Sequence, residues 1–479
     1  MLNKKIKIVF IGAELNPLIK VGGLADVMGA LPKALSKLGV EVLIILPFYG
    51  SLNKKLYPSK LVKANLKLAD TKISFAVYQT LLAKTKIKIL LIKNKLFDRQ
   101  EIYLDQNKLQ DTERFAAFSK CAVEAIKVLN LKPDLVHCHD WHTALVPTIL
   151  DEYSLSDKNF ANIPTLLTIH NLASQGLSTL ELVDYLALNK KLTPALMEDY
   201  YDDQDKLELL KIGILSADAI NAVSPTYAQE ILTKKYGAGL EVYLQRRQKN
   251  LSGILNGIDT DVFNPQTDKA IAKKYNVNNF VKYKPVNKQA LQAKLNLSVL
   301  DVPVFALISR LVSQKGLDIL KPCWEALLKQ DLQIIILGTG EKKYEEEFRI
   351  LNKKYPAKFK AVLKFDADLA QQIYAGSDFF LMPSSFEPCG LGQLISMRYG
   401  TIPIVRATGG LKDTVRHKKT GFVFSDYNHQ ALAKVCDLAL NIFQQPKAMQ
   451  KMIKAAMLQD FSWDKSSQAY LKLYKKLIK

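Results

Sequence analysis

Cysteine is scarce in this 479-residue sequence, and long apolar runs are missing. The five cysteines are scattered, odd in number and free of any CxxC pair, which argues against a disulfide framework and fits a reducing compartment. No uninterrupted apolar stretch approaches the roughly 20 residues that a membrane-spanning helix needs. The apolar run at residues 6–11 is too short for a signal peptide and leads into a Gly-rich turn. We therefore expect a cytoplasmic protein with no membrane partner.

Acidic residues are outnumbered, with 46 Asp and Glu against 67 Lys and Arg, which gives a net charge of +21. Such an excess invites a nucleic-acid interpretation. The lysines, however, are spread along the chain, and Lys is a poorer residue than Arg for bidentate recognition of bases or phosphates. We interpret the charge as a solvated surface that helps to attract anionic substrates, and we expect no nucleic-acid partner.

Only six histidines are present, and three of them lie in the segment His137-Cys-His139-Asp140-Trp-His142. Three imidazoles and a carboxylate so close together are typical of a metal site, although Asp140 stands one position early for the metallo-hydrolase pattern. The alternative is a polar strand end at which Asp140 binds sugar hydroxyls. We favour the second interpretation and expect no metal; a zinc hydrolase remains the rival.

Short β-branched apolar runs alternate with amphipathic helical stretches along the whole chain, for example at residues 6–14, 41–50, 134–142 and 302–311. Continuous apolar runs of this length are typical of strands buried in a parallel sheet. The segment GILNGIDTDVFNP, starting at residue 253, has the Gly, Asn, Asp and Pro content of a linker. We predict an α/β fold of two Rossmann-like doubly wound domains, residues 1–252 and 253–458, that face a cleft, followed by a C-terminal helix at 459–479.

Residues that follow strands are the candidate ligand contacts, because open α/β sheets bind ligands beyond the carboxyl ends of their strands. Lys20-Val-Gly22-Gly23-Leu-Ala-Asp26 follows the first strand and opens a helix. Its glycines let backbone amides approach an anion, and Lys20 adds a positive charge; a plain strand-to-helix turn is the alternative. His170 and Asn171 end the strand after the histidine segment and are expected beside Asp140.

The second half carries three further segments of this kind. Arg310 and Lys315 share one loop and suit a diphosphate, unless that loop is simply exposed. Glu387 is placed to accept hydrogen bonds from ribose or glucose hydroxyls. The amides of residues 390–392 are expected to open a helix and to bind phosphate oxygens. Thr408-Gly409-Gly410 follows the next strand, and its backbone amides are expected to bind an anion in the same way.

Seven motifs, in order, resemble the bacterial glycogen synthases and plant starch synthases over residues 6–465: KVGGLADV, HCHDWHT, TIHN, NGIDTDVFNP, SRLVSQKG, PSSFEPCGLGQL and YGTIPIVRATGGLKDTV. The resemblance implies a GT-B fold whose C-terminal helix crosses back to the N-terminal domain. It also implies that no cofactor or metal is needed. The expected reaction transfers glucose from ADP-glucose to the 4-hydroxyl at the non-reducing end of an α-1,4-glucan, with retention of configuration.

The resemblance also assigns roles to residues of the N-terminal half. Lys20, Gly22 and Gly23 match the donor-phosphate loop, which Asp26 closes. Asp140 and Asn171 match sugar or acceptor contacts. His170 matches the histidine beside the anomeric centre, and Asn256 matches a site residue.

In the C-terminal half, Arg310 and Lys315 match the pair that stabilises the departing ADP, and Glu387 matches the active-site glutamate. The start of the phosphate-binding helix is matched by Cys389, Gly390 and Leu391, with Thr408 and Gly409 as further contacts. Two positions depart mildly from many members, Val21 and Gly392, where Thr is common. Related retaining families place a second glutamate where this chain has Ile395, so a carboxylate pair is not expected.

Two other interpretations stay open beside the zinc hydrolase. One is a catalytically inactive scaffold that binds glucan or nucleotide sugar, against which the intact Lys20, Arg310, Lys315 and Glu387 argue. The other is an NAD-dependent dehydrogenase supported by Gly338-Thr-Gly340, which lacks the third glycine of the dinucleotide fingerprint.

Overall fold

The computed structural model describes residues 5–52, 59–68, 71–104, 108–188 and 206–479. It divides into two units, Met1–Asn256 with Trp463–Lys479, and Gly257–Ser462. The sequence placed these divisions at residues 252/253 and 458/459. In the structure the first boundary follows Asn256 instead, because Asn256 still donates its backbone N–H to Val223 O (3.3 Å) of the first unit.

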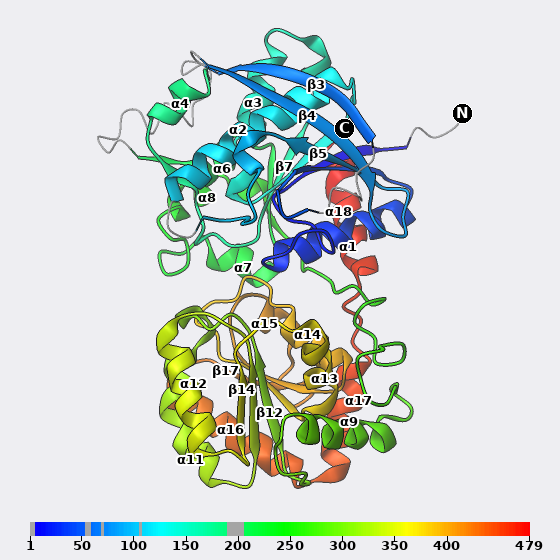
Figure 1. The fold of residues 1–479 in the computed structure, drawn as a ribbon, viewed down its shortest axis with the longest axis vertical. Helices are drawn as coiled ribbons and strands as arrows, with labels where there is room; N and C mark the ends of the chain where they lie inside the picture. Colours follow the sequence, from blue (N-terminus) through cyan, green and yellow to red (C-terminus); the bar gives the residue numbers. More distant parts are fainter. Residues whose placement is uncertain (1–4, 53–58, 69–70, 105–107, 189–205) are drawn as a thin grey trace. The chain divides into compact units, whose positions relative to one another are not determined.

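The first unit is built on a nine-stranded sheet in the order β11-β10-β7-β6-β1-β2-β5-β4-β3 (Figure 1). Its strands are β1 (Lys7–Ile11), β2 (Glu41–Pro47), β3 (Ser59–Leu68), β4 (Thr71–Leu81), β5 (Lys88–Lys93), β6 (Leu135–His139), β7 (Thr165–Ile169), β10 (Ala219–Ala222) and β11 (Leu251–Gly253). Seven strands are parallel, and β1 lies between β2 and β6. The order in which strands are added reverses at β1, with β2 and β5 on one side and β6 and β7 on the other, so ligands are expected beyond β1 and β6.

The edge of this sheet differs from the expected parallel arrangement, because β3 pairs antiparallel with β4 and β4 pairs antiparallel with β5. Of residues 60–72, interpreted from sequence as part of a solvated charged surface, residues 60–68 lie in β3 and residues 71–72 begin β4. Alternating exposed and buried residues in β3 explain why no continuous apolar run marks it. A separate short pair joins β8 (Leu177–Ser178) to β9 (Leu207–Glu208).

Helices cover the first sheet: α1 (Gly23–Lys37), α2 (Lys108–Val128), α3 (Val146–Ser154), α4 (Glu181–Tyr185), α6 (Leu209–Ser216), α7 (Pro225–Glu230), α8 (Glu241–Arg246) and α18 (Trp463–Leu477). The last of these confirms the predicted crossing of the C-terminal helix, since α18 packs against α1 in the first unit. Its Tyr470 and Tyr474 are fully buried. Asn221 Nδ2 donates to Tyr470 Oη (2.9 Å), and Tyr474 Oη lies 2.9 Å from His137 Nδ1.

The second unit is built on six parallel strands in the order β14-β13-β12-β15-β16-β17. The strands are β12 (Val304–Ile308), β13 (Gln333–Leu337), β14 (Phe359–Val362), β15 (Phe379–Met382), β16 (Ile402–Arg406) and β17 (Phe422–Phe424). Counted from β12, this is the doubly wound order 3-2-1-4-5-6, whose ligand crevice lies where the order reverses, beyond β12 and β15.

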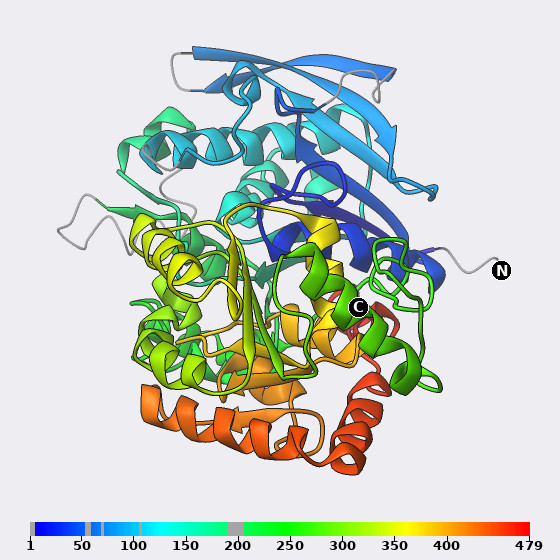
Figure 2. The ribbon, with the colours of Figure 1, turned by 60° about the horizontal axis from the view of Figure 1, so that its bottom comes forward.

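The helices of the second unit are α9 (Phe280–Lys294), α10 (Leu317–Leu320), α11 (Trp324–Lys329), α12 (Lys342–Lys354), α13 (Ala367–Gly376), α14 (Gly392–Arg398), α15 (Gly409–Thr414), α16 (His429–Phe443) and α17 (Pro446–Met457). They lie on both sides of the sheet, with α11 and α12 on one side and α13 and α14 on the other (Figures 1 and 2). This is the α/β arrangement that the alternating pattern predicts.

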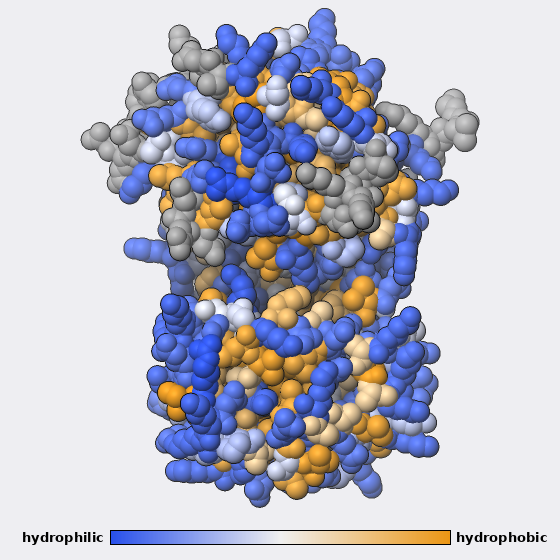
Figure 3. Space-filling view, viewed as in Figure 1, coloured by the Kyte–Doolittle hydropathy of each residue, from blue (hydrophilic) through white to orange (hydrophobic). Residues whose placement is uncertain are grey.

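On the visible face of each unit, hydrophilic side chains are interspersed with apolar areas (Figure 3). Within the described ranges, no helix has the length and apolar character required to span a bilayer.

Candidate active site

An ion pair stands at the point where the strand order of the second sheet reverses. Lys315 follows β12, Glu387 follows β15, and Lys315 Nζ lies 2.6 Å from Glu387 Oε2. Ser384 Oγ donates to the same carboxylate oxygen (2.9 Å). Both side chains are largely buried, with 18% and 8% exposed. Two motifs that the sequence offered separately therefore form one fixed pair of charges.

Arg310 lies on the same loop as Lys315, but it is exposed. Its backbone carbonyl accepts hydrogen bonds from Val312 N and Ser309 Oγ (3.0 Å each), which fixes the turn that carries it. Its guanidinium has no hydrogen bond or ion pair with any residue that the structure describes. This cation is therefore available to a ligand without displacing a protein partner.

Two glycines allow the loops around Glu387 to pack backbone against backbone. A Cβ on Gly409 (φ +43°) would lie 1.9 Å from Glu387 O, and one on Gly316 (φ +74°) would lie 2.1 Å from Pro383 O. No side chain fits in these positions, and positive φ is itself unfavourable for other residues. The loops after β12, β15 and β16 are thus held in contact, with Glu387 between its neighbours.

The Gly338-Thr-Gly340 segment serves the same packing. A Cβ on Gly338 would lie 1.8 Å from Ser309 O, and one on Gly340 would lie 2.2 Å from Leu311 O. These glycines bring the loop after β13 against the loop that carries Arg310. The segment therefore has a packing role that needs no dinucleotide.

Sequence reasoning missed Arg406, a buried residue at the end of β16. Its Nε donates to Ser384 O (2.7 Å), and its guanidinium also donates to Ser385 O. Ser385 N in turn donates to Gln314 O (2.9 Å). Arg406 thereby fixes the loop that carries Glu387. The available signal was a charged residue that ends an otherwise apolar strand.

The turn before α14 places backbone amides beside this loop. The first bond inside the helix runs from Ile395 N to Leu391 O (2.9 Å), so the preceding amides have no partner within the helix. Gln393 Nε2 donates to the carbonyls of Cys389 and Gly390 (3.0 Å each) and holds the turn, in which Gly390 has φ +73°. Thr408 occupies the corresponding position before α15.

In the first unit, Glu14 occupies the amides of the predicted phosphate loop. Glu14 Oε2 accepts hydrogen bonds from Val21 N (2.6 Å) and Gly22 N (2.8 Å), and Tyr103 Oη donates to Oε1 (2.6 Å). The amides of Val21 and Gly22 in the loop after β1 are thus occupied by a carboxylate of the protein itself. Sequence reasoning missed Glu14, which directly follows the apolar run and Gly-Ala.

Lys20 and Asp26 are paired with each other in this loop. Lys20 Nζ lies 2.7 and 2.8 Å from the two carboxylate oxygens of Asp26, and Asn16 Nδ2 also donates to Asp26 (3.0 Å). Gly22 caps α1, which starts at Gly23. The predicted loop residues are therefore together, with Lys20 tethered beside the start of the helix.

Asp140 lies where β6 ends, beside the end of β7, as the sequence predicts. Its Oδ1 accepts hydrogen bonds from His170 N (2.6 Å) and Asn171 N (3.3 Å), and its φ of +57° is unusual for a residue with a side chain. Burial raises the pKa of the Asp140 carboxyl to about 7; the two N–H donors lower it and Glu14 raises it. Asp140 therefore shapes the turn that carries His170 and Asn171.

His170 is a neutral imidazole near pH 7. Burial lowers its pKa to about 3, and its Nε2 lies 3.0 Å from His139 Nδ1. A neutral ring exchanges hydrogen bonds with hydroxyls without adding a charge.

The histidines at 137–142 form contacts within the protein. His137 Nε2 lies 2.7 Å from Thr168 Oγ1, so both ring nitrogens of His137 have protein partners, one of them Tyr474. His142 stacks on Tyr103 with ring centroids 5.2 Å apart. Among the residues that the structure describes, no group of three or more His, Cys, Asp or Glu is placed to hold a metal ion.

Asn256, at the end of the first unit's main segment, is buried. Its Oδ1 is buried without a hydrogen-bond partner in the described part of the chain. Buried polar atoms in proteins are rarely unpaired. Asn256 therefore carries an acceptor that the described residues leave unpaired.

Comparisons with known proteins identify the family of this chain. A family model described as the starch synthase catalytic domain matches residues 7–246, and one described as glycosyl transferases group 1 matches residues 288–458. The glycogen synthase of Thermosipho africanus is 43% identical over 99% of both chains. This chain belongs to the starch and glycogen synthase family.

Solved structures extend the family relationship to the fold. The catalytic domain of starch synthase IV from Arabidopsis thaliana, bound to ADP and acarbose, is 32% identical, covers 99% of both chains and superposes with a TM-score of 0.91. Sucrose-phosphate synthase from Thermosynechococcus elongatus, at 19% identity and a TM-score of 0.60, shares the fold. The chain is thus a hexosyltransferase with the GT-B fold, as the seven motifs predict.

Proposed function

We propose that this enzyme transfers glucose from ADP-glucose to the 4-hydroxyl at the non-reducing end of an α-1,4-glucan, with retention of configuration. The observation that carries the proposal is the Lys315–Glu387 pair at the reversal point of the second sheet. In support, a family member of the same fold is bound to ADP and acarbose. The substrates are then ADP-glucose and the glucan.

The leaving ADP requires stabilisation of negative charge as the glycosidic bond breaks. Arg310 and Lys315 supply two cations on one loop, and the amides of residues 389–391 add donors for phosphate oxygens at the start of α14. Fixed charges in a site that excludes water stabilise developing charge without reorganising. Glu387 holds Lys315 in place and offers an acceptor to sugar hydroxyls, and Thr408 and Gly409 support its loop.

The first unit supplies the contacts to the sugar and a further set to phosphate. The donor-phosphate contacts are Lys20, Gly22 and Gly23, and the Asp26 carboxylate holds Lys20 beside them. Asp140, Asn171 and Asn256 bind hydroxyls, and neutral His170 donates a hydrogen bond beside the anomeric carbon. In the proposed complex a donor-phosphate oxygen replaces the Glu14 carboxylate on the Val21 and Gly22 amides, which already bind an anionic oxygen.

Retention follows from a same-face displacement. A glycosidase of the retaining type uses two carboxylates about 5–5.5 Å apart, whereas the buried Ile395 stands where related families have a second glutamate. In the proposed step the bond from the anomeric carbon to the diphosphate oxygen breaks. The acceptor oxygen bonds to the same face and passes its proton to a departing phosphate oxygen.

The reaction proposed here needs no metal or other cofactor, since Arg310, Lys315 and backbone amides provide the positive charge. We place the enzyme in the cytoplasm, without nucleic-acid or membrane partners. All five cysteines are free and buried, which suits a reducing compartment.

The test is a reaction of ADP-glucose with maltotetraose in the presence of EDTA, followed by proton NMR of the anomeric region. We expect maltopentaose with a new α-linkage. A new β-linkage would contradict retention. A reaction that stops in EDTA and returns only with zinc would contradict metal independence and favour the hydrolase alternative.

A further inference from the structure

The second unit contains a cavity that none of the proposed catalytic residues lines. Its volume is about 310 Å³, and it is formed where the chain enters and leaves the unit. Ile258 N donates to Phe461 O (2.8 Å), so the two chain segments lie side by side in its wall. Small-molecule sites span roughly 300–1,000 Å³, which puts this cavity within the range for a small ligand.

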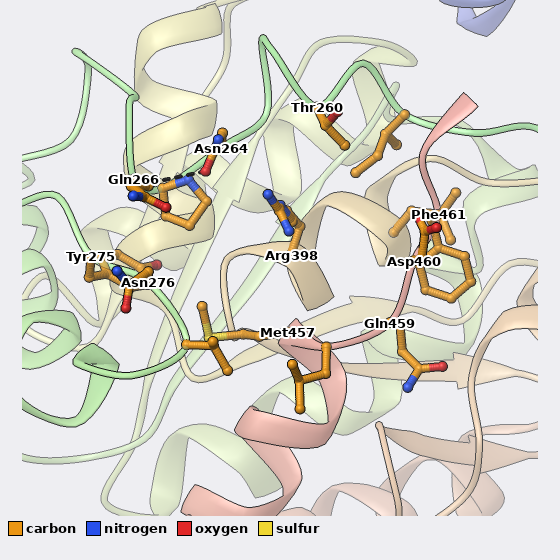
Figure 4. Close-up of a pocket in the computed structure, with 15 residues that line it drawn as sticks. Thr260, Asn264, Gln266, Tyr275, Asn276, Arg398, Met457, Gln459, Asp460 and Phe461 are labelled. Atoms are coloured by element: carbon orange, nitrogen blue, oxygen red, sulfur yellow. Dashed lines mark hydrogen bonds between the residues drawn. The ribbon is translucent and has the colours of Figure 1, made fainter. Parts of the chain in front are cut away.

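Arg398, the last residue of α14, projects into this cavity (Figure 4). Its Nε is buried without a hydrogen-bond partner, and its guanidinium has no ion pair with any described residue. A buried Nε–H group is normally paired, since an unpaired one loses its hydration without compensation, and the rest of this guanidinium is open to the cavity. The arrangement indicates that a ligand anion completes the site.

Two amide side chains add donors beside Arg398. The Oδ1 atoms of Asn264 and Asn276 already accept the backbone N–H groups of Gln266 (3.1 Å) and Asn278 (2.9 Å). Both residues line the cavity, and their Nδ2 groups have no partner in the described part of the chain. Such a lining recognises oxygen acceptors, while apolar side chains such as Leu394 and Phe461 cover the remaining wall.

The charge of the lining selects the kind of anion. Arg398 and Asp460 are its charged residues, and Asp460 Oδ1 accepts Ser462 N (2.9 Å). Arg398 is the one cation of the lining, and a monoanion needs one cation, whereas a dianion such as a phosphomonoester needs more. The planar guanidinium also matches a carboxylate in two parallel hydrogen bonds.

We propose that this cavity binds a small organic acid that carries one carboxylate and several hydroxyl groups. The carboxylate pairs with Arg398, and the hydroxyls accept hydrogen bonds from Asn264 and Asn276. The site is separate from the Glu387 loop, because the seven residues of α14 place about 10 Å of helix between Arg398 and that loop.

Gluconate is a suitable probe, with sorbitol as its uncharged counterpart and sorbitol 6-phosphate as its dianionic one. We expect isothermal calorimetry to detect gluconate binding to the wild-type protein, with no binding of sorbitol and at least tenfold weaker binding of sorbitol 6-phosphate. Arg398→Gln should abolish gluconate binding. Thermal melting without ligand checks that the variant is folded.

Asn264→Asp provides a second variant, because it keeps the oxygen that accepts Gln266 N and replaces the donor with an anionic oxygen. We expect at least tenfold weaker gluconate binding in this variant as well. The proposal is overturned if wild-type protein does not bind gluconate, or if both variants bind it as wild type does. Tighter binding of sorbitol 6-phosphate than of gluconate would overturn the assignment to a carboxylate.

Discussion

At the scale of single residues, the proposed active site differs in how its cations are held. Lys315 is paired with Glu387 and Lys20 with Asp26, whereas the Arg310 guanidinium has no partner among the described residues. A phosphate therefore binds Arg310 without breaking an existing interaction, but it shares Lys315 with a carboxylate. Each of these cations is expected to contribute in the transition state.

Removing either cation of the β12 loop should slow turnover strongly. We expect Arg310→Ala and Lys315→Ala each to lower kcat by at least ~10²-fold, the scale of losing one preorganised charge contact. Lys315→Ala also leaves the buried Glu387 unpaired, so thermal melting must show that it is folded. The control is Arg349→Ala, which removes an exposed ion pair with Glu345 on α12. Wild-type turnover in both loop variants would contradict the assignment.

Buried histidines make the first unit sensitive to acid. Burial lowers the pKa of His142 to about 3, below its usual value of 6.5. Because the unfolded chain binds the proton more tightly, the stability from neutral His142 is present above about pH 6.5 and is lost as pH falls toward 3. His142→Phe keeps the stacking on Tyr103 but cannot be protonated. We expect its apparent Tm to fall less than that of wild type between about pH 7 and 5; equal losses would contradict this.

At the scale of elements, glycines set the distance between neighbouring loops. Gly409 and Gly39 both have positive φ, but a Cβ on Gly39 would meet nothing within 4 Å, whereas one on Gly409 would lie 1.9 Å from Glu387 O. Gly409→Ala and Gly39→Ala thus both introduce a backbone strain of about 1–2 kcal/mol. Only Gly409→Ala also creates a clash with the Glu387 loop.

Gly409→Ala should therefore displace Glu387 and impair catalysis. We expect kcat to fall by ~10²-fold, since a displacement of about 1 Å at reacting groups has that effect. Gly39→Ala should lower Tm and leave kcat near wild type. Steady-state kinetics of both variants checks this, and equal effects on kcat would show that loop packing is not the cause.

At the scale of the whole molecule, the C-terminal helix α18 belongs to the first unit and is joined to its sheet. Tyr474 Oη lies 2.9 Å from His137 Nδ1 in the fully buried interior. Tyr474→Phe leaves that nitrogen unpaired, at a cost of about 1–3 kcal/mol. We expect a lower Tm, whereas Lys475→Ala, an exposed change one residue on, should have no effect. Equal melting of all three proteins would contradict a stabilising role for this contact.

Much of this architecture is predictable from sequence, because buried parallel strands leave continuous apolar runs and ligand contacts follow their ends. That reasoning finds Lys315 and Glu387 separately. It does not find their ion pair, which depends on how two loops pack through Gly316. The hairpin of β3 and β4 is missed because one exposed face removes the apolar run.

Other site residues lie beyond sequence reasoning for similar physical causes. Glu14 satisfies the loop amides only because the chain folds back after β1, and Arg406 supports Ser384 from a neighbouring strand. Both contacts join residues whose proximity depends on tertiary packing. A pattern of residue types predicts where a strand ends, but it does not predict which side chain fills a particular gap.

The most direct test of the account is glucose transfer to glycogen, measured side by side with radiolabelled ADP-glucose and UDP-glucose. We predict incorporation from ADP-glucose, faster than from UDP-glucose, with the label released as maltose by β-amylase. No incorporation from ADP-glucose, or a clear preference for UDP-glucose, would contradict it.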